Sequence, residues 1–260
     1  MSKDFLNKLF DLKDKNVLVT GAAGQLGRTI CGAYIKAGSR VIGADNDSNG
    51  KKKSDPGLAE YLLMDISDKE SVVKAFKHIY SKSGRLDMLV NNAGVNVFEP
   101  FEERSEKSFD WVTDVNLKGT FLCIQEYAKQ ARRGLHKGSI VNITSLYGVI
   151  SPDFRIYTDC NRSNSEVYGA VKAGIIQMTK YFAVHLAQYG IRVNCVSPGG
   201  IFNPDSPQGA DFIKNYSYRC PMGRMAKAEE MVGGVLYLSS EAAAYTTGQN
   251  LVIDGGFSCW

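Results

Sequence analysis

The stretch that decides the fold reads Val17-Leu18-Val19-Thr20-Gly21-Ala22-Ala23-Gly24-Gln25-Leu26-Gly27. A short apolar run comes first, as in a buried β-strand, and three glycines follow it. The pattern from Gln25 to Ala37 predicts a helix, which Gly38 ends. Such a glycine turn brings backbone N–H groups and the positive end of a helix dipole to a pyrophosphate. A tight turn without a ligand is the alternative, because a glycine triplet alone is a weak signal.

Short apolar runs and helical stretches alternate along the rest of the chain. Further strands are expected at residues 40–44, 61–64, 88–90, 140–143, 191–196 and 250–253. Helices are expected at residues 67–83, 109–132, 167–189 and 229–239, the first of them capped by Ser67 or Asp68 and ended by Gly84. This alternation predicts an α/β chain with a single-domain Rossmann fold over residues 1–260. Its doubly wound sheet of seven mostly parallel strands would carry helices on both faces.

Composition and charge narrow the class of protein. The 260 residues are 44% hydrophobic and 22% charged, with a formal net charge of +4, too mild an excess to argue for nucleic acid. No run of 18 apolar residues occurs and the N-terminus lacks the features of a signal peptide, so we expect a cytoplasmic protein that does not span a membrane. The six cysteines and three histidines have no metal-ligand spacing. They predict no metal site, and buried thiols in a reducing compartment.

Acidic residues follow the second and third predicted strands. Asp45 is placed to accept hydrogen bonds from the adenosine ribose, which favours NAD and repels the 2′-phosphate of NADP. Lys51, Lys52 and Lys53 could instead bind that phosphate, although such a charge run is usually a solvated loop. Asp65 is expected either to bond the adenine amine or to cap the next helix.

A tyrosine and a lysine share one face of the predicted helix 167–189. Tyr168 and Lys172 are four positions apart, which puts the phenol and the ammonium side by side. A free tyrosine has a pKa near 10, and a neighbouring cation lowers that pKa toward a value useful for proton transfer. Because this spacing also occurs by chance, the neighbouring motifs must decide its meaning.

Those motifs resemble the short-chain dehydrogenases/reductases of the classical type, from Phe10 to Gly256. The matching pieces are, in order, Thr20-Gly21 to Gly27, Asp65, Asn91-Asn92-Ala93-Gly94, Asn116-Leu117-Lys118-Gly119, Ser145, Tyr168 to Lys172, Pro198-Gly199 and Asp254-Gly255-Gly256. The resemblance implies an NAD(P)-dependent enzyme that acts on CH–OH groups by hydride transfer.

The resemblance also implies a role for individual residues. Ser145 would stabilise charge on the substrate oxygen, and Tyr168 would give or take the proton. Lys172 would hold the nicotinamide ribose and lower the pKa of Tyr168, and Asn116 would support a water relay behind Lys172. The implied cofactor-binding residues are Gly21, Gly24, Gln25, Leu26, Gly27, Asp45, Asp65, Ile66, Asn92, Ala93, Gly94, Tyr168, Lys172, Pro198, Gly199 and Ile201.

Three features depart from the family pattern. Gln25 stands where a glycine is usual, and the resulting G-x-x-G-x-x-G resembles the extended branch of the superfamily. Asn203 stands where threonine is usual. The gap between Ser145 and Tyr168 is longer than usual, and the extra residues lie within 151–165.

This insertion is part of the irregular stretch 148–166, and it is tethered between two catalytic residues, so we expect it to lie over or beside the site. Its polar residues suit a hydroxyl-rich or charged substrate such as a sugar derivative; they include Arg155, Tyr157, Asp159, Asn161 and Arg162. A surface flap without substrate contact is the alternative. Residues 200–218 would form the family's variable substrate loop, a mobile lid.

Together these features predict an NAD(H)-dependent oxidoreductase that interconverts a secondary alcohol and a carbonyl on a small, polar, sugar-derived substrate, with NADP less favoured. One alternative is an NADPH-dependent 3-oxoacyl-thioester reductase, which Asp45 opposes. The other is a non-catalytic dinucleotide sensor or scaffold, a class that typically loses the tyrosine or the lysine. The family is usually tetrameric, so we expect a homotetramer that binds neither nucleic acid nor a membrane.

Overall fold

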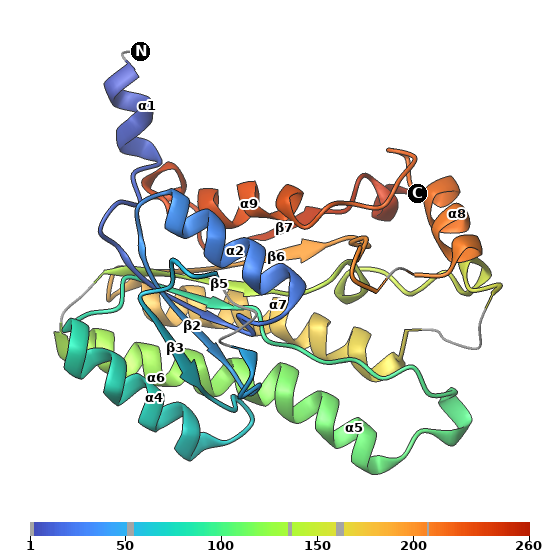
Figure 1. Cartoon of the computed structure of the whole chain (residues 1–260), viewed down its shortest axis with the longest axis horizontal. Helices are drawn as coiled ribbons and strands as arrows, with labels where there is room; N and C mark the ends of the chain where they lie inside the picture. Colours follow the sequence, from blue (N-terminus) through green and yellow to red (C-terminus); the bar gives the residue numbers. More distant parts are fainter. Residues whose placement is uncertain (1–2, 51–54, 135–136, 160–163, 207) are drawn as a thin grey trace.

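Seven parallel strands form one sheet in the computed structural model (Figure 1), which describes residues 3–50, 55–134, 137–159, 164–206 and 208–260. The strands are β1 (Asn16–Thr20), β2 (Arg40–Asp45), β3 (Glu60–Leu63), β4 (Met88–Asn91), β5 (Gly138–Ile143), β6 (Ile191–Pro198) and β7 (Asn250–Ile253). Their order across the sheet is β3-β2-β1-β4-β5-β6-β7. The predicted Rossmann fold is confirmed, and strand bounds differ from the prediction by no more than two residues.

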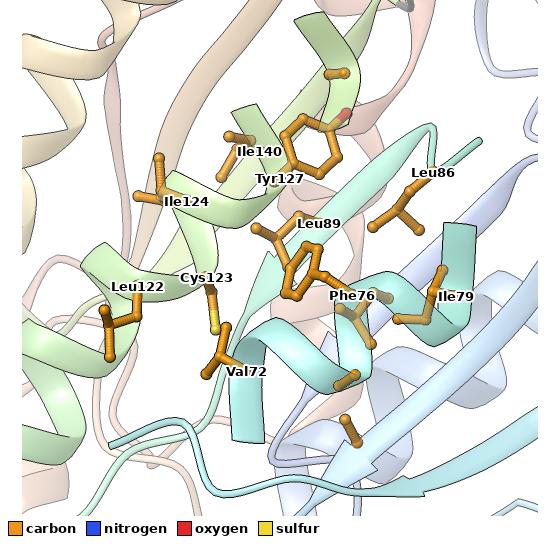
Figure 2. Close-up of a cluster of buried hydrophobic side chains, with 14 of the residues drawn as sticks. Val72, Phe76, Ile79, Leu86, Leu89, Leu122, Cys123, Ile124, Tyr127 and Ile140 are labelled. Atoms are coloured by element: carbon orange, nitrogen blue, oxygen red, sulfur yellow. The ribbon is translucent and has the colours of Figure 1, made fainter. Parts of the chain in front are cut away.

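Helices cover both faces of this sheet (Figure 1). On one face, α2 (Gln25–Lys36) and α9 (Glu229–Ser239) bury Ile30, Tyr34 and Val235 against the strands. On the other face lie α4 (Lys69–Ser83), α6 (Gly119–Gly134) and α7 (Glu166–Ala187). Figure 2 shows side chains of α4 and α6, among them Phe76 and Ile124, packed over the strands on that face. The short helix α1 (Lys3–Leu9) precedes the sheet.

The predicted ends of α4 are confirmed. The Asp68 carboxylate accepts hydrogen bonds from the backbone N–H groups of Glu70 and Ser71, so Asp68 and not Ser67 is the N-cap. Gly84 ends the helix with a φ of 68°, the left-handed conformation that favours glycine.

The helix predicted over residues 109–132 is interrupted. A π-helical segment, Asp114–Lys118, separates α5 (Glu106–Thr113) from α6. The fully buried Asn116 lies in this segment, and its Nδ2 donates to the carbonyls of Val112 and Val95 at 2.8 and 2.9 Å. A side chain that bonds the carbonyl four residues earlier competes with the main-chain ladder, which accounts for the wider turn.

The stretch 200–218, predicted as a loop, contains most of a helix, α8 (Ala210–Arg219). Its inner face buries Phe212 and Tyr216, and the Tyr216 hydroxyl accepts a 2.6 Å hydrogen bond from the Gly200 N–H. This part of the stretch is therefore a helix and not an irregular loop, because α8 has an apolar face that packs on the body.

The cysteines only partly follow the sequence prediction. Four of those described are buried thiols (Cys31, Cys123, Cys195 and Cys220), whereas Cys259 is exposed in the last turn of the chain. Cys160 lies outside the described residues. Among the described residues, no His, Cys, Asp or Glu side chains form a group of three or more that could hold a metal ion. None of the helices described is both long and apolar enough to cross a bilayer.

The strand order places a crevice beside β1. The connection that follows β1 crosses toward β2, and the one that follows β4 crosses in the opposite direction toward β5, so the two connecting segments diverge at the carboxyl ends of these neighbouring strands. Thr20 ends β1 and Asn91 ends β4, so the glycine turn and the Asn92 segment face one another across this gap.

Candidate active site

A cleft of about 650 Å³ opens at the carboxyl ends of the strands. The predicted site residues that line it are Gly21, Gly24, Leu26, Gly27, Asp45, Asp65, Ile66, Asn92, Ala93, Gly94, Ser145, Tyr168, Lys172, Pro198, Gly199 and Ile201. The structure thus brings together residues from the first turn of the fold and from the segment after β6.

Two of the three glycines are required by close approach of the backbone. A Cβ on Gly21, whose φ is +66°, would lie 2.7 Å from the Cα of Ala93. A Cβ on Gly27 would lie 2.0 Å from the Gly21 carbonyl oxygen. At Gly24 the nearest atom would be 3.4 Å away, so the backbone there has room for a side chain. Gly24 is the N-cap of α2 and no side chain caps this helix end, which leaves it accessible to an anion.

Gln25 is the one expected cofactor residue that does not line the cleft. Its Nε2 donates a 2.7 Å hydrogen bond to the Phe202 carbonyl, across to the loop that follows β6. Three residues further on, Arg28 forms an ion pair of 3.0 Å with Asp205 of the same loop. The glycine spacing carries no information about these long-range contacts, which connect the start of α2 to the segment over the cleft.

Asp45 lies at one end of the cleft. Its Oδ2 accepts a hydrogen bond of 2.9 Å from the Ala23 N–H, and its Oδ1 accepts one of 3.2 Å from the Asp47 N–H. Asn46 and Asp47 also line the cleft, and the sequence reasoning had missed them although they directly follow Asp45. The basic run Lys51–Lys53 lies outside the described residues.

Asp65 lines the cleft and does not cap α4. Its Oδ1 accepts hydrogen bonds from the N–H and the hydroxyl of Ser67, at 2.8 and 2.7 Å. The capping alternative is therefore excluded, and the carboxylate stabilises a turn after β3 instead.

Asn92 connects the two strands that border the crevice. Its Nδ2 donates to the carbonyl oxygens of Thr20 and Gly21 at 3.0 and 3.1 Å. The Thr20 hydroxyl in turn accepts hydrogen bonds from the N–H groups of Asn92 and Ala93. These contacts hold the glycine turn against the β4 segment, so Asn92 shapes the cleft as well as lining it.

Ser145, Tyr168 and Lys172 meet at the inner end of the cleft. Ser145 follows β5 and is buried, and Tyr168 is in the first turn of α7, where its N–H donates to the capping Ser165 hydroxyl. The Lys172 Nζ lies 5.4 Å from the centroid of the Tyr168 ring and donates 3.1 Å to the Ile143 carbonyl. One turn of helix therefore presents the phenol and the ammonium to the end of β5, as the spacing predicted.

The pKa values at this end of the cleft are set mainly by burial. Burial raises the pKa of Tyr168, and a hydrogen bond with the Ser145 side chain opposes that rise. Burial also lowers the pKa of Lys172 to about 8. The sequence predicted a lowered pKa for Tyr168, whereas the net shift is upward because burial outweighs the opposing hydrogen bond. Because both groups are removed from water together, each favours its neutral form.

Asn116 lies behind Lys172, outside the cleft lining. Its buried Oδ1 receives no hydrogen bond from any described residue. A Cβ added to Gly94 would lie 2.8 Å from this oxygen and 3.4 Å from the Lys172 Nζ, so both atoms border the same small space. An unpartnered buried acceptor next to an ammonium is suited to bind water, as the predicted relay requires.

A second cavity of about 320 Å³ adjoins the cleft, and we call it the substrate pocket. Ser145 and Tyr168 line both cavities. The insertion contributes Tyr157 and Asn164, so it lies beside the site as predicted. Sequence reasoning had missed Tyr147, although it follows Ser145 by only two positions.

Other polar residues of the insertion are directed elsewhere. Arg155 pairs with Asp153 and its side chain is 86% exposed. The Asp159 carboxylate accepts a 3.2 Å hydrogen bond from the Phe212 N–H at the start of α8. Asn161 and Arg162 lie outside the described residues. The insertion thus lines part of the substrate pocket and also contacts α8.

Comparison with known proteins gives one family. A family model described as enoyl-(acyl carrier protein) reductase matches residues 21–258. The chain is 34% identical to the 3-oxoacyl-acyl-carrier-protein reductase FabG of Thermotoga maritima, over 94% of this chain and 98% of the relative. It is 33% identical to the cyclopentanol dehydrogenase of Comamonas testosteroni (95% and 98%) and 33% to the D-threitol dehydrogenase of Mycolicibacterium smegmatis (96% and 95%).

Solved structures agree with this result. A short-chain dehydrogenase from Leptospira borgpetersenii with bound NAD+ is 42% identical, with a TM-score of 0.88 over 99% of this chain and 97% of that one. A gluconate 5-dehydrogenase from Burkholderia cenocepacia, in complex with NADP and tartrate, is 26% identical, with a TM-score of 0.87 over 98% and 99%.

Proposed function

Because this chain belongs to the short-chain dehydrogenase/reductase family and is an oxidoreductase of that family, we propose that it uses NAD(H) to interconvert a secondary alcohol and a ketone. The substrate is a small polar molecule derived from a sugar or polyol, and Tyr168 transfers the proton. Ser145, Lys172 and Asn116 complete the catalytic set.

The observation that carries this proposal is the junction of two cavities at Ser145 and Tyr168. The larger cavity contains the glycine turn and Asp45, and the smaller one lies beside the insertion. Two molecules placed in these cavities would meet at the Ser145 and Tyr168 hydroxyls. A hydride transfer between a dinucleotide and an alcohol needs such an arrangement.

The larger cavity fits a nicotinamide dinucleotide. The uncapped start of α2 and the close backbone approach at Gly21 and Gly27 suit a pyrophosphate, and Asp45 suits a ribose. Lys172 is placed to hold the second ribose at the inner end. When bound there, the nicotinamide supplies or accepts the hydride at the carbonyl carbon.

Side chains of the protein donate the proton to the substrate and then replace it. In the reducing direction, the Tyr168 O–H donates its proton to the carbonyl oxygen while the Ser145 hydroxyl donates a hydrogen bond to that oxygen. The Lys172 ammonium stabilises the phenolate that results. Asn116 holds the water through which Tyr168 regains its proton, and the oxidising direction uses the same steps in reverse.

The preference for NAD rests on two carboxylates. Asp45 and Asp47 both line the end of the cleft where the adenosine ribose is expected, and a 2′-phosphate there would meet like charge. The NAD+ in the Leptospira structure supports this choice, whereas the NADP in the gluconate 5-dehydrogenase shows that the fold accepts either cofactor.

Two alternatives are less well supported. A 3-oxoacyl-thioester reductase agrees with the FabG relative, but the carboxylates oppose NADPH, and the substrate pocket places phenols and amides beside its apolar side chains. A non-catalytic sensor has no need of Ser145, Tyr168 and Lys172 converging on one point.

A substrate screen with a catalytic variant tests the proposal. We expect the wild type to oxidise polyols such as D-threitol or D-arabinitol with NAD+, followed by absorbance of the nicotinamide. Tyr168→Phe should lower kcat by roughly 100- to 10,000-fold, the usual size of general acid–base catalysis, and leave NADH affinity nearly unchanged. Tyr245→Phe, at a fully exposed tyrosine, is the matched control. Reduction of an acetoacetyl thioester with NADPH, without alcohol oxidation, would favour the reductase alternative.

We also propose that the protein is a homotetramer. Apolar side chains are exposed on three neighbouring helices: Trp111 on α5, Phe121 on α6, and Tyr181 and Val184 on α7. Association through these helices would cover them. Sedimentation velocity gives the mass directly, and a monomer at micromolar concentration would contradict the assignment.

A further inference from the structure

The substrate pocket contains a cluster of uncharged polar side chains that the proposed mechanism does not use. Tyr157 and Asn164 come from the insertion, Tyr147 follows Ser145, and Asn96 follows β4. We propose that these four residues, here called the hydroxyl clamp, bind the hydroxyl groups on the carbons next to the reacting carbon. They thereby select a neutral polyol or ketose over a sugar acid or an alcohol with a single hydroxyl. This inference rests on the proposed function.

The first argument is the orientation of the amides. The Asn96 Oδ1 accepts hydrogen bonds from the Val97 N–H and the Ser165 hydroxyl, both at 2.9 Å. Its Nδ2 is therefore the donor, and it bonds the Oδ1 of Asn164. With its oxygen held in this way, Asn164 directs its Nδ2 toward Tyr157 and the pocket. The clamp thus presents an N–H donor whose direction is set by two other residues.

The second argument is that the phenols are poorly satisfied by one another. The Tyr147 and Tyr157 hydroxyls are 3.4 Å apart, and the Asn164 Nδ2 lies 3.5 Å from the Tyr157 hydroxyl. Both distances are at the outer limit of a hydrogen bond, whereas hydroxyl pairs prefer about 2.7 to 2.8 Å. A ligand hydroxyl placed among these groups would make shorter bonds. Burial raises the pKa of Tyr147 far above its ordinary value, so its O–H is a neutral donor at working pH.

The third argument is charge. No Lys, Arg, His, Asp or Glu of the described residues lines the substrate pocket. Of the described charged side chains of the insertion, Arg155 pairs with Asp153 and Asp159 bonds the start of α8. A substrate carboxylate is normally bound by a cation, and an unpaired one is costly to desolvate. The described lining of the pocket therefore suits hydroxyl groups better than a carboxylate.

The clamp is also mechanically coupled to Tyr168. The Ser165 hydroxyl donates to Asn96 and accepts from the Tyr168 N–H at 3.3 Å, so it belongs to both the clamp and the cap of α7. On the other side, the Tyr157 ring packs on Phe212 of α8 with centroids 5.2 Å apart. These hydrogen bonds and ring contacts therefore fix the positions of the clamp residues relative to the Tyr168 phenol.

Two variants remove one hydrogen-bonding group each: Tyr157→Phe keeps the ring, and Asn164→Ala removes the amide. With D-arabinitol and saturating NAD+, each should raise KM by roughly 10-fold, the scale of one hydrogen bond between neutral groups. We expect kcat to change less than KM and the NADH dissociation constant to be unaffected. Tm should be unaffected in Tyr157→Phe and somewhat lower in Asn164→Ala, because the Asn96 Nδ2 loses its acceptor there. Thr158→Val is the control, because Thr158 bonds Asn215 of α8 and does not line the pocket.

Two further measurements make the test specific. The wild type should prefer D-arabinitol to D-gluconate, and a higher kcat/KM for the acid would overturn the neutral-substrate assignment. Loss of activity toward cyclopentanol equal to that toward the polyol would mean that the variants only disturb packing. An unchanged polyol KM in both variants, with an active wild type, overturns the clamp alone. A wild type without any NAD(H)-linked alcohol oxidation overturns the proposed function instead.

Discussion

One wall of the cleft at the ends of β1, β2 and β4 is the main chain of the glycine turn, whereas the substrate pocket is walled mainly by side chains from distant segments. In the cleft, a Cβ on Gly27 would lie 2.0 Å from a carbonyl oxygen, so one added carbon is enough to close the space. In the pocket, Tyr157 and Asn164 belong to an insertion that packs on α8 through rings and hydrogen bonds. Where main chain forms the wall, substitutions can change the shape of a cofactor site very little. Where side chains form the wall, single substitutions can change which substrate the site binds.

The largest expected effect is at the inner end of the cleft, where Lys172 lies beside Tyr168. Lys172→Met should lower turnover roughly 100-fold or more, because the Tyr168 phenolate loses its stabilising cation. The free energy of unfolding at pH 7 should nevertheless rise. Burial lowers the pKa of Lys172 from 10.5 to about 8, so the folded state holds the ammonium at a cost below pH 8.

The pH dependence of this effect has a definite sign. Between about pH 8 and 10.5, the folded wild type has released a proton that the unfolded chain still binds, so its stability rises with pH relative to Lys172→Met. The relative gain is up to about 3 kcal/mol over this window. Urea unfolding of both proteins at pH 7, 8, 9 and 10 measures it. A stability difference that does not vary with pH would contradict the assigned pKa.

The next effect tests the main-chain wall of the cleft. Gly27→Ala should lower the free energy of unfolding by about 3 kcal/mol, since the Gly21 carbonyl must move, and NADH affinity should fall with it. Gly24→Ala is the matched control, because its Cβ would have 3.4 Å of clearance and should leave the fold intact. Urea unfolding and NADH titration measure both variants. An equal loss of stability in Gly27→Ala and Gly24→Ala would mean that the free space around the added Cβ does not determine the destabilisation.

A smaller effect is expected at the adenosine end of the cleft. Asp45→Asn keeps the size of the side chain and removes its charge, so NADPH affinity should increase by roughly 10-fold relative to NADH. Fluorescence titration with both cofactors gives the ratio, and Asp65→Asn serves as a control at a carboxylate bonded to Ser67. If the wild type already binds NADPH more tightly, the carboxylates do not determine the preference.

The smallest effect concerns the seating of α8 on the insertion. Asp159→Ala removes the acceptor for the Phe212 N–H and should cost about 1 kcal/mol of stability, with a higher KM for the polyol. Arg155→Ala, at a side chain that is 86% exposed, should change stability by less than about 0.5 kcal/mol. Thermal unfolding compares the two. An effect of Asp159→Ala on NADH affinity alone would argue that the insertion acts on the cleft and not on the pocket.

Local patterns predicted most of the cleft because its elements are adjacent in sequence or end at the same sheet edge. The apolar runs predicted seven strands, and all but Gln25 of the expected cofactor residues line the cleft. The interruption between α5 and α6 escaped prediction, since it depends on where the Asn116 side chain finds its acceptors. The helix α8 was missed for a similar reason: its apolar face follows the packing of Phe212 and Tyr216 on distant segments.

The sequence by itself determined the order of strands and helices, the glycine turn and the pairing of Tyr168 with Lys172, because each depends on spacings within one element or one turn. Only the tertiary structure decided that Gln25 reaches Phe202, that Tyr168 is buried so that its pKa is raised, and that four uncharged polar residues meet beside Ser145. Those outcomes depend on which groups are buried next to one another. This is determined only when segments that are distant in the sequence pack together.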